Sequence, residues 1–195
     1  MTTTTRRNLV QIRWHGRGGQ GVVTASNLLA EAALEDGRYF QSFPDFGAER
    51  SGAPIIAYSR VSDTFIHIRS PVTEPDIVMV LDATLIGKVD FLAGLQEDGA
   101  VVVNTPLSPE EMREHLNVGL RRVCTVDGTS ISTDLLGRNI PNVPMLGGLL
   151  RVEEIVSQEA VLATIRHRLG ARLSEQVVQA NLETFRRAYQ EARVG

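Results

Sequence analysis

A glycine-rich loop near the N-terminus has the residue types that bind an anion. It consists of Gly16, Arg17, Gly18, Gly19, Gln20 and Gly21. Its glycines match the pattern G-x-G-x-x-G, in which a backbone free of side chains lets a ligand approach the amides at the start of a helix. Arg17 and Gln20 add a cation and an amide, which suit a phosphate or a carboxylate. We therefore expect a phosphate-bearing ligand or a partner protein here; a tight turn without a ligand is the alternative.

Two missing features argue against the commoner nucleotide-binding proteins. The loop lacks the Gly-Lys-Ser/Thr sequence of a P-loop NTPase. A dinucleotide-binding domain places an acidic residue at the end of its second strand, where the carboxylate holds a ribose. The nearest candidate is Asp45, which follows Pro44 in a predicted loop. A free-standing nicotinamide dehydrogenase is therefore disfavoured.

A second loop, between Phe43 and Pro54, combines aromatic rings, glycines and an acid–base pair. Phe46, Glu49 and Arg50 stand within it. An exposed aromatic ring and ordered charges need binding partners, so these residues suit a functional loop better than a simple reversal of the chain.

The elements around the first loop predict a βαβ unit. Residues 9–14 form a strand that runs into the loop, and apolar residues recur at helical spacing over 22–33 until Asp36 and Gly37 close the helix. Residues 39–43 give a short second strand. Strand, glycine turn, helix and strand in this order are typical of an α/β fold.

The middle of the chain departs from this alternation. Residues 55–59 and 64–68 are β-rich runs around a short polar turn, which predicts an inserted antiparallel hairpin. Further strands are predicted at 77–81, 100–103 and 121–126. The first two of these are continuous apolar runs, as expected for strands covered on both faces.

Helices are predicted for the rest of the chain. Ser108, followed by a proline and then Glu111, has the residues of a capping box at a helix start. Amphipathic helices are expected at 157–169 and 174–192. The predicted fold class is therefore α/β, a Rossmann-like and mostly parallel sheet with an inserted β-hairpin and C-terminal helices, in one domain over residues 1–195.

Composition excludes several classes of partner. The chain has 195 residues, 43% of them hydrophobic, which suffices for one domain with a substantial core. A net charge of −3 without a basic run argues against nucleic acid. The N-terminus lacks the apolar segment of a signal peptide and no stretch approaches transmembrane length, so we expect a cytoplasmic protein without membrane contact. Cys124, the single cysteine, is expected to be a buried small hydrophobe, since one thiolate cannot hold a cluster.

Polar residues at the ends of strands and the starts of helices are further candidates for binding. Asp82, Asn104 and Thr105 follow predicted strands, where the ligand crevices of α/β proteins lie. We expect Asp82 to cap a helix over 83–95, and Asn104 with Thr105 to contact a ligand. Asn142 is expected either to cap a helix or to contact a ligand.

No self-sufficient active site is evident. His15 directly precedes the glycine loop, and we expect a hydrogen-bonded structural imidazole there and no base. The other three histidines have no metal-ligand spacing. We therefore predict no catalytic residue and no metal site.

Taken together, the two loops resemble the gamma subunit of 2-oxoacid:acceptor oxidoreductases, of which the pyruvate:ferredoxin oxidoreductases are the best known. The resemblance rests on residues 16–21 and, about thirty residues later, on Phe46-Gly-Ala-Glu-Arg-Ser-Gly-Ala-Pro54. It extends through Ser70-Pro71, 75–82, Asn104-Thr105, 139–148 and the final helix. The likeness thus covers nearly the whole chain.

This resemblance implies a role in a larger enzyme. The complete enzymes decarboxylate a 2-oxoacid on thiamine diphosphate, pass electrons through iron–sulfur clusters to ferredoxin or NAD, and deliver the acyl group to coenzyme A. This chain lacks the cluster cysteines and an evident thiamine diphosphate site, so the resemblance places those groups on alpha, beta and delta partner subunits. Not catalytic alone, the gamma subunit is expected to pack against these partners and to help bind coenzyme A.

The resemblance also suggests roles for single residues. The amides of the glycine loop and Arg17 could hold the phosphates of coenzyme A. Glu49 and Arg50 could pair with each other, with a partner subunit or with the ligand, and Asn142 could touch coenzyme A or a neighbouring subunit. A non-catalytic nucleotide-binding or assembly module is the alternative function. Ala53-Pro54 favours pyruvate as the substrate, with an aryl 2-oxoacid such as phenylglyoxylate or indolepyruvate as the alternative.

Overall fold

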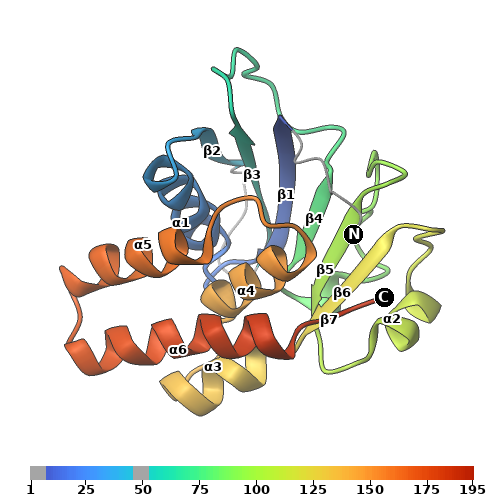
Figure 1. Ribbon diagram of the computed structural model, residues 1–195. Helices are drawn as coiled ribbons and strands as arrows, with labels where there is room; N and C mark the ends of the chain where they lie inside the picture. The colour runs from blue at the N-terminus through green and yellow to red at the C-terminus, as the bar shows by residue number, and fades with distance from the viewer. Residues whose placement is uncertain (1–7, 46–52) are drawn as a thin grey trace, which may run out of the picture.

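A seven-stranded sheet forms the centre of the computed structural model, which describes residues 8–45 and 53–195 (Figure 1). Its strands are β1 (Leu9–Arg17), β2 (Tyr39–Asp45), β3 (Pro54–Ser62), β4 (Ile77–Val80), β5 (Ala100–Asn104), β6 (Arg122–Val126) and β7 (Arg193–Val194). They lie in the order β2-β3-β1-β4-β5-β6-β7. The neighbours β1, β4, β5 and β6 are parallel, whereas β3 and β7 run antiparallel to the strands beside them. The expected α/β fold with a mostly parallel sheet is confirmed.

The antiparallel hairpin lies earlier in the chain than we expected. β2 pairs with β3 from Tyr39 opposite Ser62 to Asp45 opposite Ile56. The prediction that 55–59 pairs with 64–68 is wrong, because residues 64–68 form no strand. β3 already has β2 on one side and β1 on the other, so neither of its edges is left for a later segment.

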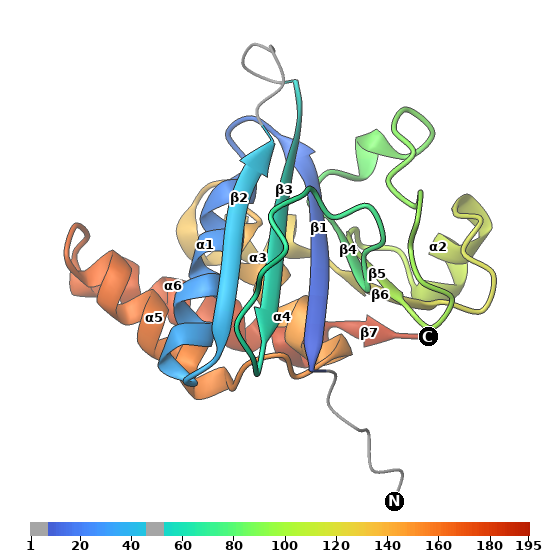
Figure 2. The same ribbon diagram turned by 90° about the horizontal axis from the view of Figure 1, so that it is seen from above.

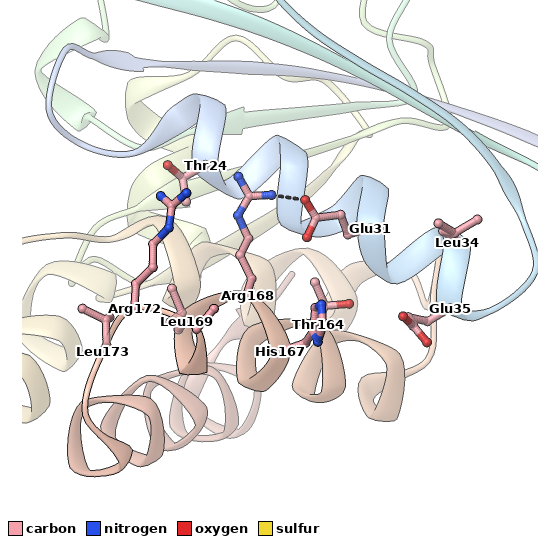
Figure 3. A pocket seen from close by; sticks show the side chains of 11 residues that line it. Thr24, Glu31, Leu34, Glu35, Thr164, His167, Arg168, Leu169, Arg172 and Leu173 are labelled. Atoms are coloured by element: carbon pink, nitrogen blue, oxygen red, sulfur yellow. Dashed lines mark hydrogen bonds and ion pairs between the residues drawn. The ribbon is translucent and has the colours of Figure 1, made fainter.

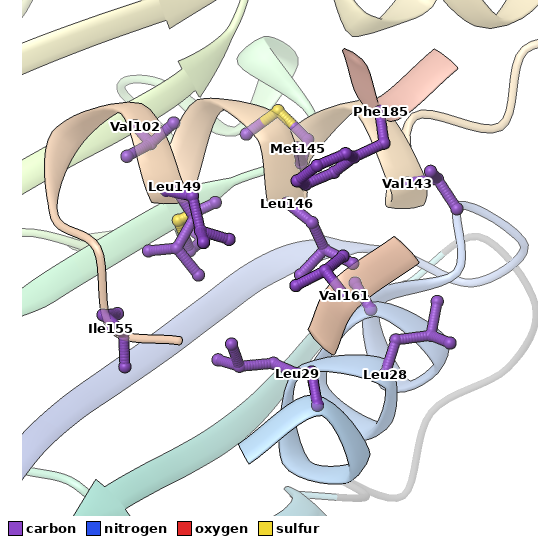
Figure 4. Packing of buried hydrophobic residues seen from close by; sticks show 14 of the residues in the cluster. Leu28, Leu29, Val102, Val143, Met145, Leu146, Leu149, Ile155, Val161 and Phe185 are labelled. Atoms are coloured by element: carbon purple, nitrogen blue, oxygen red, sulfur yellow. The ribbon is translucent and has the colours of Figure 1, made fainter. Parts of the chain in front are cut away.

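Helices cover one face of the sheet. They are α1 (Val22–Glu35), α3 (Gly128–Leu136), α4 (Asn142–Val152), α5 (Gln158–Gly170) and α6 (Glu175–Glu191). Figure 4 shows how their side chains meet: Leu28 and Leu29 of α1 lie near Leu146 and Leu149 of α4, with Val161 of α5 beside them. No helix in the described ranges is long and apolar enough to cross a membrane.

The opposite face carries a second, smaller core. Val78 and Val80 of β4 belong to it, while Ile77 and Met79 of the same strand face the helices. The helix α2 (Pro109–His115) supplies Met112 to this second core. Both faces of β4 are therefore buried, which explains its continuous apolar sequence.

Two buried arginines form hydrogen bonds with the irregular segments that cover the rest of this second face. The Arg13 guanidinium donates to the carbonyl oxygens of Phe91, at 2.9 Å, and Ala93, at 2.5 Å. Arg60 donates to the Ser70 carbonyl oxygen at 2.8 Å. Figure 2 shows the segment after β3 crossing in front of β3 and β1. The arginines thus supply the hydrogen-bond donors that the carbonyl groups of this non-helical cover need when buried.

The N-terminus of α2 is the capping box that the sequence predicts. Ser108 Oγ accepts a hydrogen bond from the Glu111 backbone N–H at 3.2 Å, and Glu111 Oε2 accepts one from the Ser108 N–H at 2.7 Å. Two otherwise unpaired backbone donors are thereby satisfied, which is the stabilising effect of this motif.

Candidate functional site

The glycine loop joins β1 to α1 at the carboxyl edge of the parallel strands. β1 extends through Gly16 and Arg17, further than the sequence predicts, because these residues pair with Ile55 and Pro54 of β3. A β-carbon at Gly16 would lie only 2.5 Å from Val22 Cγ2. The strand can therefore pass this close to α1 only with glycine at position 16.

Part of the loop backbone is already hydrogen-bonded within the chain. The Arg17 N–H donates to Gln20 Oε1 at 2.7 Å, the Gly18 N–H to the Ala53 carbonyl oxygen at 3.3 Å, and the Gln20 N–H to the Arg17 carbonyl oxygen. These three amides are not free to bind a ligand, which corrects the expectation that the whole loop offers its N–H groups. Among the described residues, no hydrogen bond uses the N–H groups of Gly19 and Gly21.

The start of α1 lacks a side-chain cap. Its N-cap residue is Gly21, with a left-handed backbone at φ 80°, and no side chain caps the helix. The first N–H groups of a helix have no partner inside the helix and carry a partial positive charge. Together with the amides of Gly19 and Gly21, this first turn is the part of the loop that can receive an anion.

Asp82 fixes the conformation of the loop. Its Oδ2 atom accepts a hydrogen bond from Gln20 Nε2 at 2.8 Å and lies 3.1 Å from Arg17 Nε. Burial alone would raise the pKa of Asp82, but hydrogen bonds from Thr84 and Gln20 and the charge of Arg17 lower it overall. The carboxylate is therefore ionised at neutral pH and holds both loop side chains.

The helix that we expected Asp82 to cap is much shorter than predicted. Asp82 Oδ1 accepts the Thr84 N–H at 2.9 Å, so the cap itself is present. It begins a single 3₁₀ turn, Ala83–Leu85, and the prediction of a helix over 83–95 is wrong. The Arg13 contacts with the Phe91 and Ala93 carbonyl groups replace helical hydrogen bonds in this segment.

Asn142 lies against the glycine loop. The N-cap of α4 is Pro141, and Asn142 Oδ1 accepts a hydrogen bond from the neighbouring Val143 N–H at 2.8 Å. A β-carbon at Gly21 would lie 2.6 Å from Asn142 Nδ2. The fold therefore brings this amide donor beside the start of α1, some 120 residues earlier in the chain.

Asn104 and Thr105 have structural partners. Asn104 Nδ2 donates to the Leu81 carbonyl oxygen and to Thr129 Oγ1, both at 2.9 Å, and Asn104 Oδ1 accepts the Thr129 N–H. Thr105 Oγ1 accepts the Leu107 N–H at 3.3 Å. Both side chains join strand ends to the following turns, and their contact with a ligand stays a prediction. Glu49 and Arg50, the other two predicted residues, lie outside the described residues.

Neither His15 nor Cys124 is placed to act as a base or a nucleophile. Burial, helped by the charge of Arg13, lowers the pKa of His15 to about 3, so the imidazole is neutral at physiological pH. His15 Nε2 accepts a hydrogen bond from Arg13 Nε at 3.2 Å. Burial raises the pKa of the Cys124 thiol to about 12. His15 is thus the hydrogen-bonded structural imidazole, and Cys124 the buried hydrophobe, that the sequence predicts.

Arg172 is a basic residue near the site that the sequence did not indicate. A groove of about 790 Å³ separates α1 from α5, and Arg168 forms an ion pair with Glu31 across it. Figure 3 shows Arg172, in the turn after α5, reaching towards Thr24 in the first turn of α1. Nothing in the local sequence signals this approach, because Arg172 and Thr24 are brought together only by the packing of α5 on α1.

Comparisons with known proteins give this arrangement its context. A family model described as pyruvate ferredoxin/flavodoxin oxidoreductase matches residues 11–191. The pyruvate synthase subunit PorC of Thermotoga maritima is 45% identical over 94% of this chain and 94% of its own length. The common gamma subunit of the pyruvate/ketoisovalerate oxidoreductases of Pyrococcus abyssi is 44% identical over 91% of this chain and 96% of its own.

Solved structures agree. The crystal structure of the pyruvate oxidoreductase subunit PORC from Thermotoga maritima has a TM-score of 0.85 and 41% identity, and the match covers 97% of this chain and 99% of that one. The 2-oxoglutarate:ferredoxin oxidoreductase of Magnetococcus marinus, solved with 2-oxoglutarate, coenzyme A and succinyl-CoA bound, has a TM-score of 0.76. Its identity is 19%, and the match covers 95% of this chain and 31% of that longer one, so it shows a shared fold alone.

Proposed function

Because the chain belongs to the pyruvate ferredoxin/flavodoxin oxidoreductase family, as a gamma-type subunit of a 2-oxoacid:ferredoxin oxidoreductase, we propose that it helps bind the coenzyme A of the assembled enzyme. The phosphates of coenzyme A would lie at the glycine loop. The observation that carries this proposal is the start of α1, which has a left-handed glycine as its N-cap and no side-chain cap.

The donors around this point suit a phosphate. The first turn of α1 offers backbone N–H groups, Asn142 offers an amide, and Arg17 offers a positive charge that Asp82 orients. Backbone N–H groups at a helix N-terminus and guanidinium groups are the donors that phosphates prefer. When bound, coenzyme A supplies the thiol that accepts the acyl group, while this chain holds its anionic part.

The cysteine content of this chain does not fit an iron–sulfur cluster. A cluster needs several thiolates, and the single cysteine, Cys124, is buried beneath α4 with its Sγ atom 3.7 Å from the Gly148 carbonyl oxygen. In the described ranges no group of three or more side chains is placed to hold a metal ion. We infer that alpha, beta and delta-type partner subunits carry the iron–sulfur clusters and the thiamine diphosphate, and that this chain packs against them.

For the substrate we propose pyruvate. Among the relatives, PorC is named for pyruvate synthase and the Pyrococcus abyssi subunit for pyruvate and ketoisovalerate oxidoreductases. An aryl 2-oxoacid such as phenylglyoxylate is the alternative. Measuring kcat/KM of the assembled enzyme for both compounds distinguishes them.

Replacing Arg17 by alanine tests the phosphate role. We expect the KM for coenzyme A of the assembled enzyme to rise about tenfold. The charge-assisted hydrogen bond between the Arg17 guanidinium and a phosphate would be lost, and such a bond changes affinity by about this factor. The thiamine-dependent decarboxylation of the 2-oxoacid, which needs no coenzyme A, should change less than twofold. Steady-state kinetics with varied coenzyme A and a separate decarboxylation assay measure the two effects.

Arg166→Ala is the matched control. Arg166 is an exposed arginine of α5 whose partner is Glu175 on α6, so its loss should leave the KM for coenzyme A unchanged. An unchanged KM in Arg17→Ala as well would contradict the phosphate role and favour the alternative, an assembly module whose loop makes subunit contacts.

A further inference from the structure

A second hollow lies on the helical side of the site, between the ends of α3 and α5 and the first half of α6. Its volume is about 510 Å³, within the range of small-molecule sites. Its aliphatic walls are formed by Leu136, Ile140, Leu169, Leu173, Val177 and Ala180. This hollow is distinct from the glycine loop and from the groove that contains Arg172.

One residue joins the hollow to the glycine loop. Asn142 lines the hollow, and the same side chain packs against Gly21 at the start of α1. The hollow also shares Leu169 and Leu173 with the groove that contains Thr24. A ligand whose anionic end lies at the start of α1 could therefore continue past Asn142 into the hollow.

The polar groups of the hollow are mostly amides. Asn142, Gln176 and Asn181 line it, its lining includes no carboxylate, and Arg138 is its single charged residue. Asn181 is 8% exposed, and its Nδ2 atom donates to the Val177 carbonyl oxygen at 2.8 Å. Among the residues that the structure describes, none donates a hydrogen bond to its Oδ1 atom, which is open to solvent and can accept one from a ligand N–H group.

These features suit a branched aliphatic chain interrupted by amides. Aliphatic walls bury methyl and methylene groups, and side-chain amides pair with both the N–H and the C=O of a ligand amide. An acidic or strongly charged ligand would find one guanidinium, that of Arg138, and no other charged group among the lining residues. A purely apolar ligand would remove Asn181 Oδ1 from water without offering it a hydrogen bond, which is unfavourable.

We propose that this hollow binds the part of the pantetheine arm of coenzyme A that follows the phosphates, with its paired methyl groups and first amide. The proposal rests on the proposed function, because it places the arm next to phosphates held at the start of α1. The thiol end of the arm then extends beyond the hollow. Asn181 and Ala180 become specificity-determining residues for the acyl acceptor.

Filling the hollow tests this proposal in the assembled enzyme. In Ala180→Phe the added ring would occupy the space of the arm, so we expect the KM for coenzyme A to rise about tenfold or more. The inhibition constant of pantetheine should rise by a similar factor. The inhibition constant of 3′-phosphoadenosine 5′-diphosphate, which has the phosphates and no arm, should stay within twofold.

Two further variants separate the effect of filling the hollow from the effects of a new ring on α6 and of misfolding. Gln179→Phe places the same ring one residue earlier on the exposed side of α6 and should leave all three constants unchanged. Asn181→Leu keeps the volume but removes the amide acceptor, and should raise the KM for coenzyme A and the inhibition constant of pantetheine without filling the hollow. It serves as the test if Ala180→Phe fails to fold by circular dichroism.

Other outcomes would overturn the proposal without touching the proposed function. Unchanged constants in Ala180→Phe and Asn181→Leu, with Arg17→Ala still impaired, would place the arm elsewhere. A folded Ala180→Phe chain that no longer assembles with the partner subunits, while Gln179→Phe does, would identify the hollow as a subunit contact. If Arg17→Ala is also normal, the proposed function itself fails.

Discussion

Replacing Gly21 by alanine is expected to destabilise the folded chain by about 3 kcal/mol or more, because two separate costs add. The first is the left-handed backbone at φ 80°, which a residue with a β-carbon rarely adopts. The second is steric, because the new methyl group would lie 2.6 Å from Asn142 Nδ2. Urea unfolding followed by circular dichroism measures the free energy.

Gly19→Ala separates the two costs. Gly19 also has a positive φ, 95°, but no atom of the described residues lies within 4 Å of its added β-carbon. We therefore expect this variant to lose only about 1–2 kcal/mol, from backbone strain alone. Removing the Asn142 side chain beyond its β-carbon in Gly21→Ala/Asn142→Ala should recover part of the difference. Equal losses in Gly21→Ala and Gly19→Ala would contradict the contact between the loop and α4.

Replacing Arg13 by methionine is expected to cost about 3–5 kcal/mol of unfolding free energy, because several buried acceptors would lose their hydrogen-bond donor at once. Methionine keeps the length of the side chain but removes all its donors. The carbonyl groups of Val72, Phe91 and Ala93 and the His15 imidazole nitrogen would then be left without this partner in a buried site. Chemical denaturation measures the loss.

The effect should be local as well as global. Hydrogen exchange of the backbone amides of 83–95 should accelerate in Arg13→Met, because the guanidinium is what ties this irregular segment to the sheet. Arg166→Met, which changes an exposed arginine, should lose less than about 1 kcal/mol. A comparable small loss in Arg13→Met would show that the segment is held by its apolar contacts alone.

Sequence reasoning found the elements whose signals are local. The glycine pattern between a strand and a helix located the loop, and the capping box at Ser108 is present as predicted. The continuous apolar runs of β4 and β5 correctly indicated strands buried on both faces. Each of these follows from neighbouring residues, so one stretch of sequence suffices.

The features that depend on distant pairing were missed. Residues 39–43 and 64–68 are both rich in β-formers, and only the sheet order determines that 39–43 pairs with β3. A polar residue after a strand suggested a ligand contact at Asn104, but the Leu81 and Thr129 groups that occupy its amide come from other elements. For the same reason, the sequence of the loop did not indicate that Asp82 pairs with Arg17 and accepts a hydrogen bond from Gln20.

The site is consequently narrower than the sequence alone suggests. The loop amides of Arg17, Gly18 and Gln20 shape the turn, and the amides of Gly19, Gly21 and the first turn of α1 are left to meet the phosphates. Hydrogen exchange of the assembled enzyme tests this division directly, because a bound phosphate slows exchange of the amides that it contacts. Coenzyme A should protect the backbone amides of residue 19 and of residues 21–24, whereas pantetheine, which lacks phosphates, should not. Unchanged exchange over 19–24 at a coenzyme A concentration that saturates turnover would place the phosphates on another subunit and contradict this account.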